Sequence, residues 1–216
     1  AKIAISFVSV GNAEANLAAE VPGFDFDAVR AAADQRWNEV LNRVVVRGGN
    51  EADLTKFYTA LYHVFQNPNV ASDVNGDYMG FDKVAHRATD YTVYQNYSGW
   101  DIIRSWTHLV SAIAPETPDI IRSMVQDGVE GGLLPFWTHQ NVETRVMVGD
   151  PGTVNVASAY AMGVRGFDTE AAFDLMVKSA TNTQDTQRWG LSEWLNLHYL
   201  DSAAMSLEYA MADFAI

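Results

Sequence analysis

Two tryptophans, a carboxylate and a guanidinium lie within seven residues in the segment Asn96–Trp106, which reads NYSGWDIIRSW. Trp100 has a flat apolar ring, and the next residue, Asp101, has a carboxylate that accepts hydrogen bonds. A hexose presents an apolar face together with hydroxyl groups, so a pocket that binds it needs both kinds of side chain. The segment is therefore a candidate pocket wall, in which Trp100 stacks on a sugar and Asp101 accepts from its hydroxyl groups.

A structural role for Asp101 is the alternative. The apolar spacing predicts a helix over residues 99–113. A carboxylate in the first turn of a helix stabilises it by roughly 0.3–1 kcal/mol through the helix dipole. The two interpretations differ in whether the carboxylate faces a bound sugar or only closes the first turn of its own helix.

A second candidate segment covers residues 131–152, GGLLPFWTHQNVETRVMVGDPG, between two predicted helices. It is too polar for a core strand and too apolar for an idle loop. Long ordered connections often carry binding groups, and Glu143 is the candidate here. The alternative is that Glu143 and Thr144 cap or staple a neighbouring helix. Two carboxyl groups roughly 6.5–9.5 Å apart are typical of inverting glycosidases, and Asp101 and Glu143 could in principle form such a pair.

Composition excludes several other classes of protein. The 216 residues are 48% hydrophobic, enough for a sizeable core, and 12% aromatic. The net charge of −13 and the lack of a basic patch argue against nucleic acid or an anionic membrane surface as partner. Without cysteine there is no disulfide and no thiolate chemistry. No apolar run is long enough for a membrane span. The sequence also lacks GxGxxG, phosphate-loop, HExxH and GxSxG motifs.

The elements that must position these groups form a short β-rich start followed by helices. Alternating apolar residues predict strands at 2–10 and 43–47. Asn75-Gly76 predicts a hairpin within 72–80, a segment whose alternating polar residues only faintly resemble a calcium loop. Asp25 and Asn50 are expected to cap helices. Apolar periodicity predicts further helices over 12–20, 117–129, 153–163, 169–180 and 202–215.

Eight segments, in order and nearly end to end, resemble glycoside hydrolase family 92, the calcium-dependent exo-acting α-mannosidases. They read KIAISFVSVGNAEANL, FDFDAVRAAADQRWNEVL, FYTALYHVFQNP, SDVNGDYMGFD, NYSGWDIIRSW, GGLLPFWTHQNVETRVMVGDPG, AYAMGVRGFD and SLEYAMADFAI. The resemblance implies a mainly α fold. Residues 1–20 would be the end of an N-terminal β-sandwich, residues 21–42 a helical linker, and residues 43–216 the first part of an (α/α)6 catalytic toroid.

The resemblance also implies a chemistry. Family members remove terminal α-linked mannose from mannosides or N-glycans by an inverting mechanism in which calcium holds two mannose hydroxyls and helps to distort the ring. Their general acid lies in a motif resembling EGNxWQY, and their base and calcium ligands lie in motifs resembling GNEP and GNDD. None of these occurs here. The catalytic residues and the calcium ligands are therefore expected outside this chain, in the remaining part of the same polypeptide.

Three residues match the family's substrate-binding positions. Trp100 and Asp101 correspond to a tryptophan–aspartate pair in the terminal mannose pocket, and Glu143 matches a stretch resembling ETxxMxGD. Gly99 stands where a bulkier residue is common, which predicts a changed pocket shape. FWTHQN departs from the commoner family pattern.

The function expected from the resemblance is that of a secreted or periplasmic bacterial exo-α-mannosidase that acts on mannose-containing glycans. The first and last segments look cut, so we expect the chain to be a piece of a longer protein. Two alternatives remain: a non-catalytic carbohydrate-binding or structural helical module, and a different helical-toroid enzyme such as an endo-glycanase or lyase. The sequence does not indicate which mannosidic linkage is cleaved.

Overall fold

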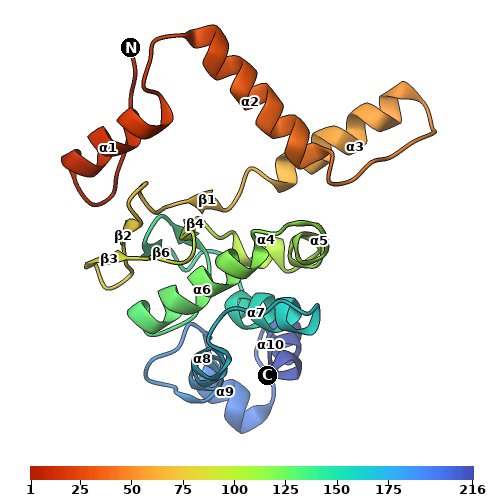
Figure 1. Cartoon of the computed structure of the whole chain (residues 1–216). Helices are drawn as coiled ribbons and strands as arrows, with labels where there is room; N and C mark the ends of the chain where they lie inside the picture. Colours follow the sequence, from red (N-terminus) through yellow and green to blue (C-terminus); the bar gives the residue numbers. More distant parts are fainter.

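The computed structural model describes residues 1–216 and is mainly helical, with three small two-stranded sheets (Figure 1). The helices are α1 Val10–Glu20, α2 Phe26–Leu41, α3 Glu51–Val64, α4 Gly99–Ile102, α5 Trp106–Ile113, α6 Thr117–Gly131, α7 Pro151–Ala161, α8 Thr169–Thr181, α9 Leu191–Leu197 and α10 Ala203–Ala215. The strands pair antiparallel: β1 Asn69–Val70 with β4 Tyr94–Gln95, β2 Asp77–Met79 with β3 Ala85–Arg87, and β5 Thr138–His139 with β6 Val142–Glu143.

Side chains at the expected positions start the helices of the N-terminal third. The Asp25 carboxylate accepts from the backbone N–H of Ala28 at 2.9 Å, and the Asn50 side chain accepts from that of Asp53 at 2.9 Å. Each contact satisfies one backbone donor that the first turn leaves without a partner. Both predicted N-caps are confirmed.

Both predicted strands at the start of the chain are wrong. Residues 1–9 run without a β-partner, and α1 begins at Val10. Residues 43–47 are also not a strand, and the N–H of Val46 donates to the Tyr58 hydroxyl at 3.3 Å. An alternating pattern becomes a strand only where another strand supplies its hydrogen bonds. No such strand lies beside either segment.

A hairpin does form in this region, but its turn lies further along the chain than the predicted turn at Asn75-Gly76. The sharp turn at Gly76, whose N–H donates to the Asp73 carbonyl at 2.8 Å, precedes β2. The reversal that joins β2 to β3 is residues 80–84. Gly76 has φ +86°, and a Cβ there would lie 2.1 Å from the Ala88 carbonyl oxygen. Glycine is thus required for close backbone approach rather than for the hairpin turn.

The helix predicted over residues 99–113 is interrupted. It divides into α4 and α5, and residues 103–105 form turns between them. The Thr107 hydroxyl donates to the buried Asn155 side chain and lies 3.2 Å from the Ile102 carbonyl oxygen. α9, which no periodic pattern predicted, follows Gly190 at φ +72°. The helices predicted over 117–129, 153–163, 169–180 and 202–215 are confirmed within two residues at each end.

The hydrophobic core lies in residues 69–216, here called the body. Its largest cluster joins α6, α7 and α8 to the segment before α4. Its members are Tyr97, Ile120, Ile121, Met124, Val125, Leu134, Val156, Ala159, Val164, Ala172 and Met176. Burying each large apolar side chain contributes roughly 1.5–3 kcal/mol. No helix is both long and apolar enough to cross a lipid bilayer.

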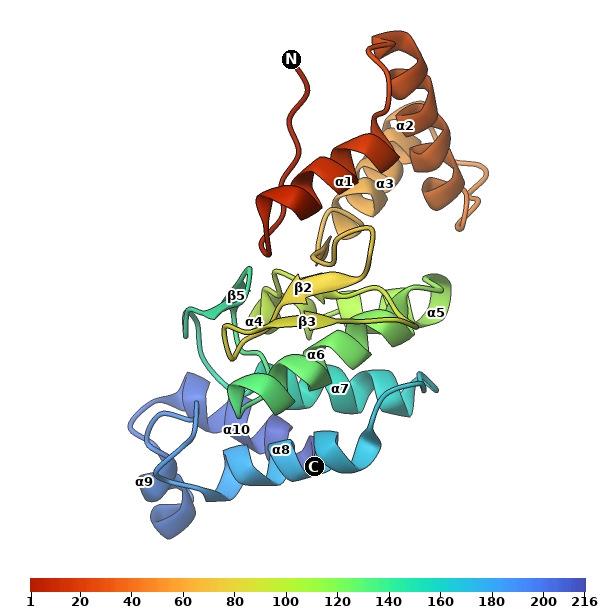
Figure 2. The same cartoon turned by 60° about the vertical axis from the view of Figure 1, so that its left-hand side comes forward.

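Residues 1–66, here called the arm, extend away from the body (Figures 1 and 2). Leu61 is the arm's one buried residue. At one attachment the buried Asp73 carboxylate of the body accepts from the Ser6 hydroxyl and from the amides of Asn12 and Asn16, each at 2.7 Å. The domain boundaries at residues 20 and 42 stay predictions.

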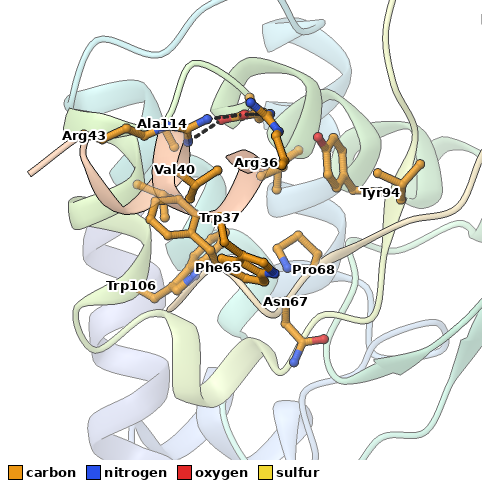
Figure 3. Close-up of a pocket in the computed structure, with 14 residues that line it drawn as sticks. Arg36, Trp37, Val40, Arg43, Phe65, Asn67, Pro68, Tyr94, Trp106 and Ala114 are labelled. Atoms are coloured by element: carbon orange, nitrogen blue, oxygen red, sulfur yellow. Dashed lines mark hydrogen bonds and ion pairs between the residues drawn. The ribbon is translucent and has the colours of Figure 1, made fainter. Parts of the chain in front are cut away.

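The second attachment surrounds an apolar cavity of about 220 Å³ between α2, the end of α3 and the body (Figure 3). Trp37 and Phe65 from the arm line it together with Trp106 of α5. At its rim the Arg43 guanidinium holds both carboxylate oxygens of Glu116, one of them at 2.8 Å. Glu116 is the only carboxylate that lines the cavity, and it is already paired with Arg43. The cavity therefore has no pair of carboxyl groups for glycoside hydrolysis.

Candidate active site

The start of α4 fixes the Trp100 ring from two sides. Its indole N–H donates to Oε1 of Glu208 in α10 at 3.1 Å. The Arg104 guanidinium lies 4.4 Å from the ring centroid and forms an ion pair with the same carboxylate. A cation over the ring face and a hydrogen bond at its edge hold the indole in one orientation. The predicted stacking platform is therefore a pre-oriented ring.

Asp101 is exposed in the first turn of α4, and the Ser98 hydroxyl donates to its Oδ2 atom. This contact joins two side chains three residues apart, and it satisfies no backbone N–H of the first turn. Oδ1 accepts no hydrogen bond within the chain. One carboxylate oxygen is thus engaged by its own helix, and the other is open to solvent. The predicted contact with sugar hydroxyls needs Oδ1, and it stays a prediction.

The Glu143 carboxylate accepts three backbone N–H groups. Oε2 lies 2.7 Å from the nitrogen of Phe136, and Oε1 lies 3.0 Å from that of Trp137 and 2.9 Å from that of Arg145. The Thr144 hydroxyl donates to the Trp137 carbonyl at 2.6 Å. These contacts hold the loop over residues 136–145 in one conformation. The alternative that Glu143 and Thr144 cap a neighbouring helix is therefore wrong, because their hydrogen-bond partners lie within the loop itself. Glu143 therefore shapes the loop, and its contact with substrate stays a prediction.

The structure brings the two candidate segments together. A Cβ on Gly99 would lie 2.0 Å from the Phe136 carbonyl oxygen, and a Cβ on Gly149 would lie 2.9 Å from Cβ of Glu208. On the same side the Thr138 N–H donates to the Tyr97 carbonyl, and the Tyr97 N–H donates to the Thr138 hydroxyl oxygen, each at 2.9 Å. The 136–150 loop thus packs against α4 and α10. The packing explains Gly99, because no bulkier residue fits between α4 and the loop.

An open groove of about 730 Å³ lies between this loop and residues 183–193. Arg145, Gln187, Trp189 and Glu193 line it, and the Trp189 ring is 79% exposed. An exposed indole beside polar side chains suits a sugar face with its hydroxyls. No sequence motif marks this segment, and its one local signal is a tryptophan, Trp189, that follows a run of polar residues.

A buried ion cluster lies behind the groove. The fully buried Arg188 side chain donates to Asp150 Oδ2 at 2.9 Å and to Asp213, and Ser179 donates to Asp150 at 3.0 Å. Burial lowers the pKa of Arg188, but Asp150 and Asp213 outweigh it and hold that pKa above its usual value. The charged cluster joins α7, α8 and α10 to the segment before α9.

Asp127 of α6 is a buried carboxyl group that sequence analysis did not single out. It is 1% exposed, and neither oxygen has a hydrogen-bond partner within the chain. Burial raises the pKa of Asp127 well above its ordinary value, and Glu130 and Glu143 add to this. Asp127 therefore keeps its proton to a higher pH than an ordinary carboxyl group does.

Calcium takes six to eight oxygen ligands, and two acidic groups of this chain offer carboxylate oxygens. The Asp73 carboxylate already accepts three side-chain donors, and Asp77 accepts from Asn12, Asn75 and Arg87. A second group, Asp82, His86 and Glu130, includes an imidazole nitrogen. Neither set fits a calcium ion. Calcium ligands outside this chain therefore stay a prediction.

Residues 12–216 match the family model of the glycosyl hydrolase family 92 catalytic domain. The chain is similar to the family GH92 α-mannosidase BT3965 from Bacteroides thetaiotaomicron, with 28% identity, a TM-score of 0.89 and coverage of 97% of this chain and 29% of that one. It is also similar to the inverting mannosidase BT2199 from Bacteroides thetaiotaomicron VPI-5482, with 26% identity, a TM-score of 0.85 and coverage of 96% and 30%. Among curated proteins, no match was found.

A helical body that carries an open groove lined by both apolar and polar side chains is the kind of concave surface at which proteins bind small molecules. The family match makes this specific: the chain belongs to glycosyl hydrolase family 92. The resemblance expected from sequence is thus confirmed. The chain spans less than a third of the length of the solved relatives described above.

Proposed function

We propose that this chain is part of an exo-acting α-mannosidase that removes terminal α-linked mannose from mannosides or N-glycans with inversion at the anomeric carbon. Family membership over residues 12–216 carries the proposal. Its support is the similarity over nearly the whole chain to two family members whose names describe mannosidases, one of them inverting. The catalytic acid and base would come from the remaining part of the same polypeptide.

In this proposal the α4 start forms one wall of the terminal mannose pocket. Trp100, fixed by Glu208 and Arg104, would present its ring to the apolar face of mannose. Asp101 would accept sugar hydroxyls through Oδ1. Glu143 would act through the loop that it holds. Calcium, bound by ligands outside this chain, would help to hold and distort the sugar.

The proposal includes finer features of the whole protein. The helices of the body would form part of an (α/α)6 toroid whose other helices come from the rest of the polypeptide. The protein would be secreted or periplasmic, where mannose-containing glycans are available. These features come from the family resemblance.

A non-catalytic carbohydrate-binding module is the second candidate. One observation favours it: Glu143 is engaged by three backbone donors, and Asp101 is partly engaged by Ser98, so the two carboxylates do not form a free acid–base pair. A module of this kind would bind mannosides without cleaving them.

Proton NMR of the complete polypeptide acting on an aryl α-mannoside separates these candidates. We expect β-mannose as the first product, because an inverting enzyme delivers water to the face opposite the leaving group. First-formed α-mannose would contradict the inverting mechanism, and binding without cleavage would favour the module. A panel of α-1,2, α-1,3, α-1,6 and mannosyl-phosphate substrates would then define the linkage.

Calcium dependence is tested on the same preparation. We expect a calcium chelator to abolish release of mannose and added calcium to restore it, whereas magnesium restores little because it demands a tighter octahedral site. Full activity after exhaustive chelation would contradict the calcium-assisted mechanism.

A further inference from the structure

Three side chains with different donor atoms converge on one point between the β2–β3 hairpin and α6. The ring nitrogen Nε2 of His86 lies 2.9 Å from Asp82 Oδ2 and 4.0 Å from Glu130 Oε1. One ligand atom from each residue lies within 4.8 Å of the other two. Asp82 and His86 belong to the hairpin, and Glu130 belongs to the last turn of α6. Figure 2 shows this hairpin lying along α6.

Gly80 marks the point on which the three side chains converge. A Cβ at this position would lie 2.5 Å from Glu130 Oε2, 2.7 Å from Asp82 Oδ1 and 2.8 Å from Cδ2 of His86. Gly80 does not have a positive φ, so its backbone conformation does not require glycine. The absence of a side chain lets the hairpin backbone approach the three groups closely.

The carboxylates are held in place by a surrounding set of donors. Glu130, whose side chain is 4% exposed, accepts from the Tyr78 hydroxyl at 2.7 Å, from Gln126 at 2.9 Å and from the N–H of Phe81 at 3.1 Å. The N–H of Val84 donates to Asp82 Oδ1 at 3.0 Å. Metal-binding carboxylates are commonly oriented by outer hydrogen bonds of this kind.

We propose that Asp82, His86 and Glu130 bind one divalent transition-metal cation, for which zinc is the reference ion. Imidazole nitrogen combined with carboxylate oxygen suits zinc or manganese better than calcium. Zinc–ligand bonds of about 2.0–2.2 Å bring tetrahedral donors to roughly 3.3–3.6 Å from one another, and the observed separations of 2.9 and 4.0 Å bracket that range.

The site would join the hairpin to α6 beside the loop that Glu143 holds. The Asn141 amide donates to the Gly80 carbonyl at 3.1 Å, and Lys83 donates to the Asn141 carbonyl. A cation here would therefore brace the β5–β6 turn through the hairpin. This role is separate from the calcium of the proposed function and does not depend on mannosidase activity.

Zinc binding to the metal-stripped complete polypeptide, measured by competition with a chromogenic chelator, tests the proposal. We expect His86→Ala to bind one zinc fewer than the parent protein, or to bind it more than about 10-fold more weakly. The matched control is His139→Ala, because His139 is exposed at the neighbouring hairpin and lies outside the site. Equal zinc binding by the parent and both variants would overturn the proposal.

Asp82→Asn is a second variant that tests the site in case His86→Ala does not fold. It removes a carboxylate ligand while keeping the size of the side chain. We expect Asp82→Asn to lose the same zinc equivalent with unchanged circular dichroism. Cobalt gives a second readout, since the intensity and position of its visible d–d bands change when it leaves octahedral water for a protein site with fewer ligands. We expect cobalt bands in the parent protein that are lost in His86→Ala and kept in His139→Ala. Displacement of zinc by equimolar calcium would contradict a transition-metal site.

Discussion

The arm and the body are stabilised by different interactions. The arm has three helices and one buried residue, Leu61, whereas the body has a core that spans α6, α7 and α8. The arm is attached through the polar groups at Asp73 and the Arg43–Glu116 pair, and through apolar side chains around the cavity that Trp37 and Phe65 line. A contiguous apolar core therefore holds the body together, whereas the arm depends on two separate contacts with it. Substitutions in the two regions should change different observables.

The largest effect is expected in the body, at Arg188. Removing this guanidinium leaves the Asp150 carboxylate buried without its partner. Breaking a buried ion pair from one side costs roughly 3–5 kcal/mol, so Arg188→Ala should lower the free energy of unfolding by about that amount in urea titrations. The control is Arg30→Ala in the arm, whose exposed pair with Asp27 should contribute about 0–1 kcal/mol. If both variants lowered the free energy of unfolding by the same amount, the buried ion pair of the body would contribute no more than an exposed pair of the arm, which would contradict this account.

A smaller and local effect is expected where the arm meets the body. Asp73→Ala removes the acceptor for Ser6, Asn12 and Asn16. Each hydrogen bond to a charged group contributes about 1.5–3 kcal/mol, so hydrogen exchange of α1 should accelerate markedly. The exchange of α6 and α7 should stay unchanged, because their core is elsewhere. Loss of protection throughout the body would show that the arm and the body unfold together.

The smallest effect depends on pH and arises at Asp127. Its pKa is raised in the folded protein, so between the unfolded value of about 3.9 and the folded value only the unfolded chain ionises. This contribution to stability is complete below about pH 4 and is lost as the pH rises. Asp127→Asn lacks this loss, so its stability relative to the parent protein should increase with pH.

Denaturant titrations at several pH values check this expectation. The exposed Asp174→Asn change on α8 is the matched control for the loss of one carboxyl group. A difference between Asp127→Asn and the parent protein that stays constant from pH 4 to pH 8 would contradict a raised pKa.

Local signals in the sequence predicted much of the body and of the helix starts. The Asp25 and Asn50 caps involve residues three apart, and the apolar stripes of α6 and α8 have a helical period. The strands predicted at 2–10 and 43–47 do not form. A strand needs hydrogen bonds from a second strand, and a local sequence pattern does not indicate whether that second strand is there. Secondary structure was thus predictable where its hydrogen bonds are local.

The candidate site was predictable only in part. Trp100 was evident from its neighbours, but Glu208, which fixes its ring, lies 108 positions away in the chain. Arg188 has the residue type of a surface position, and only the fold buries it against Asp150. For long-range contacts of this kind, the sequence around each of the two residues does not indicate which partner the residue will have.

The role of Asp101 is the point on which the proposed pocket depends, and kcat/KM of the complete polypeptide for an aryl α-mannoside tests it most directly. If Oδ1 accepts sugar hydroxyls, Asp101→Ala should lose up to two charged hydrogen bonds of about 1.5–3 kcal/mol each, which is roughly a 10²–10⁴-fold fall. Ser98→Ala removes only the contact at the helix start, so it should keep kcat/KM within a few-fold. Equally small losses in both variants, with unchanged unfolding midpoints, would mean that Asp101 only closes its helix and would contradict the proposed pocket.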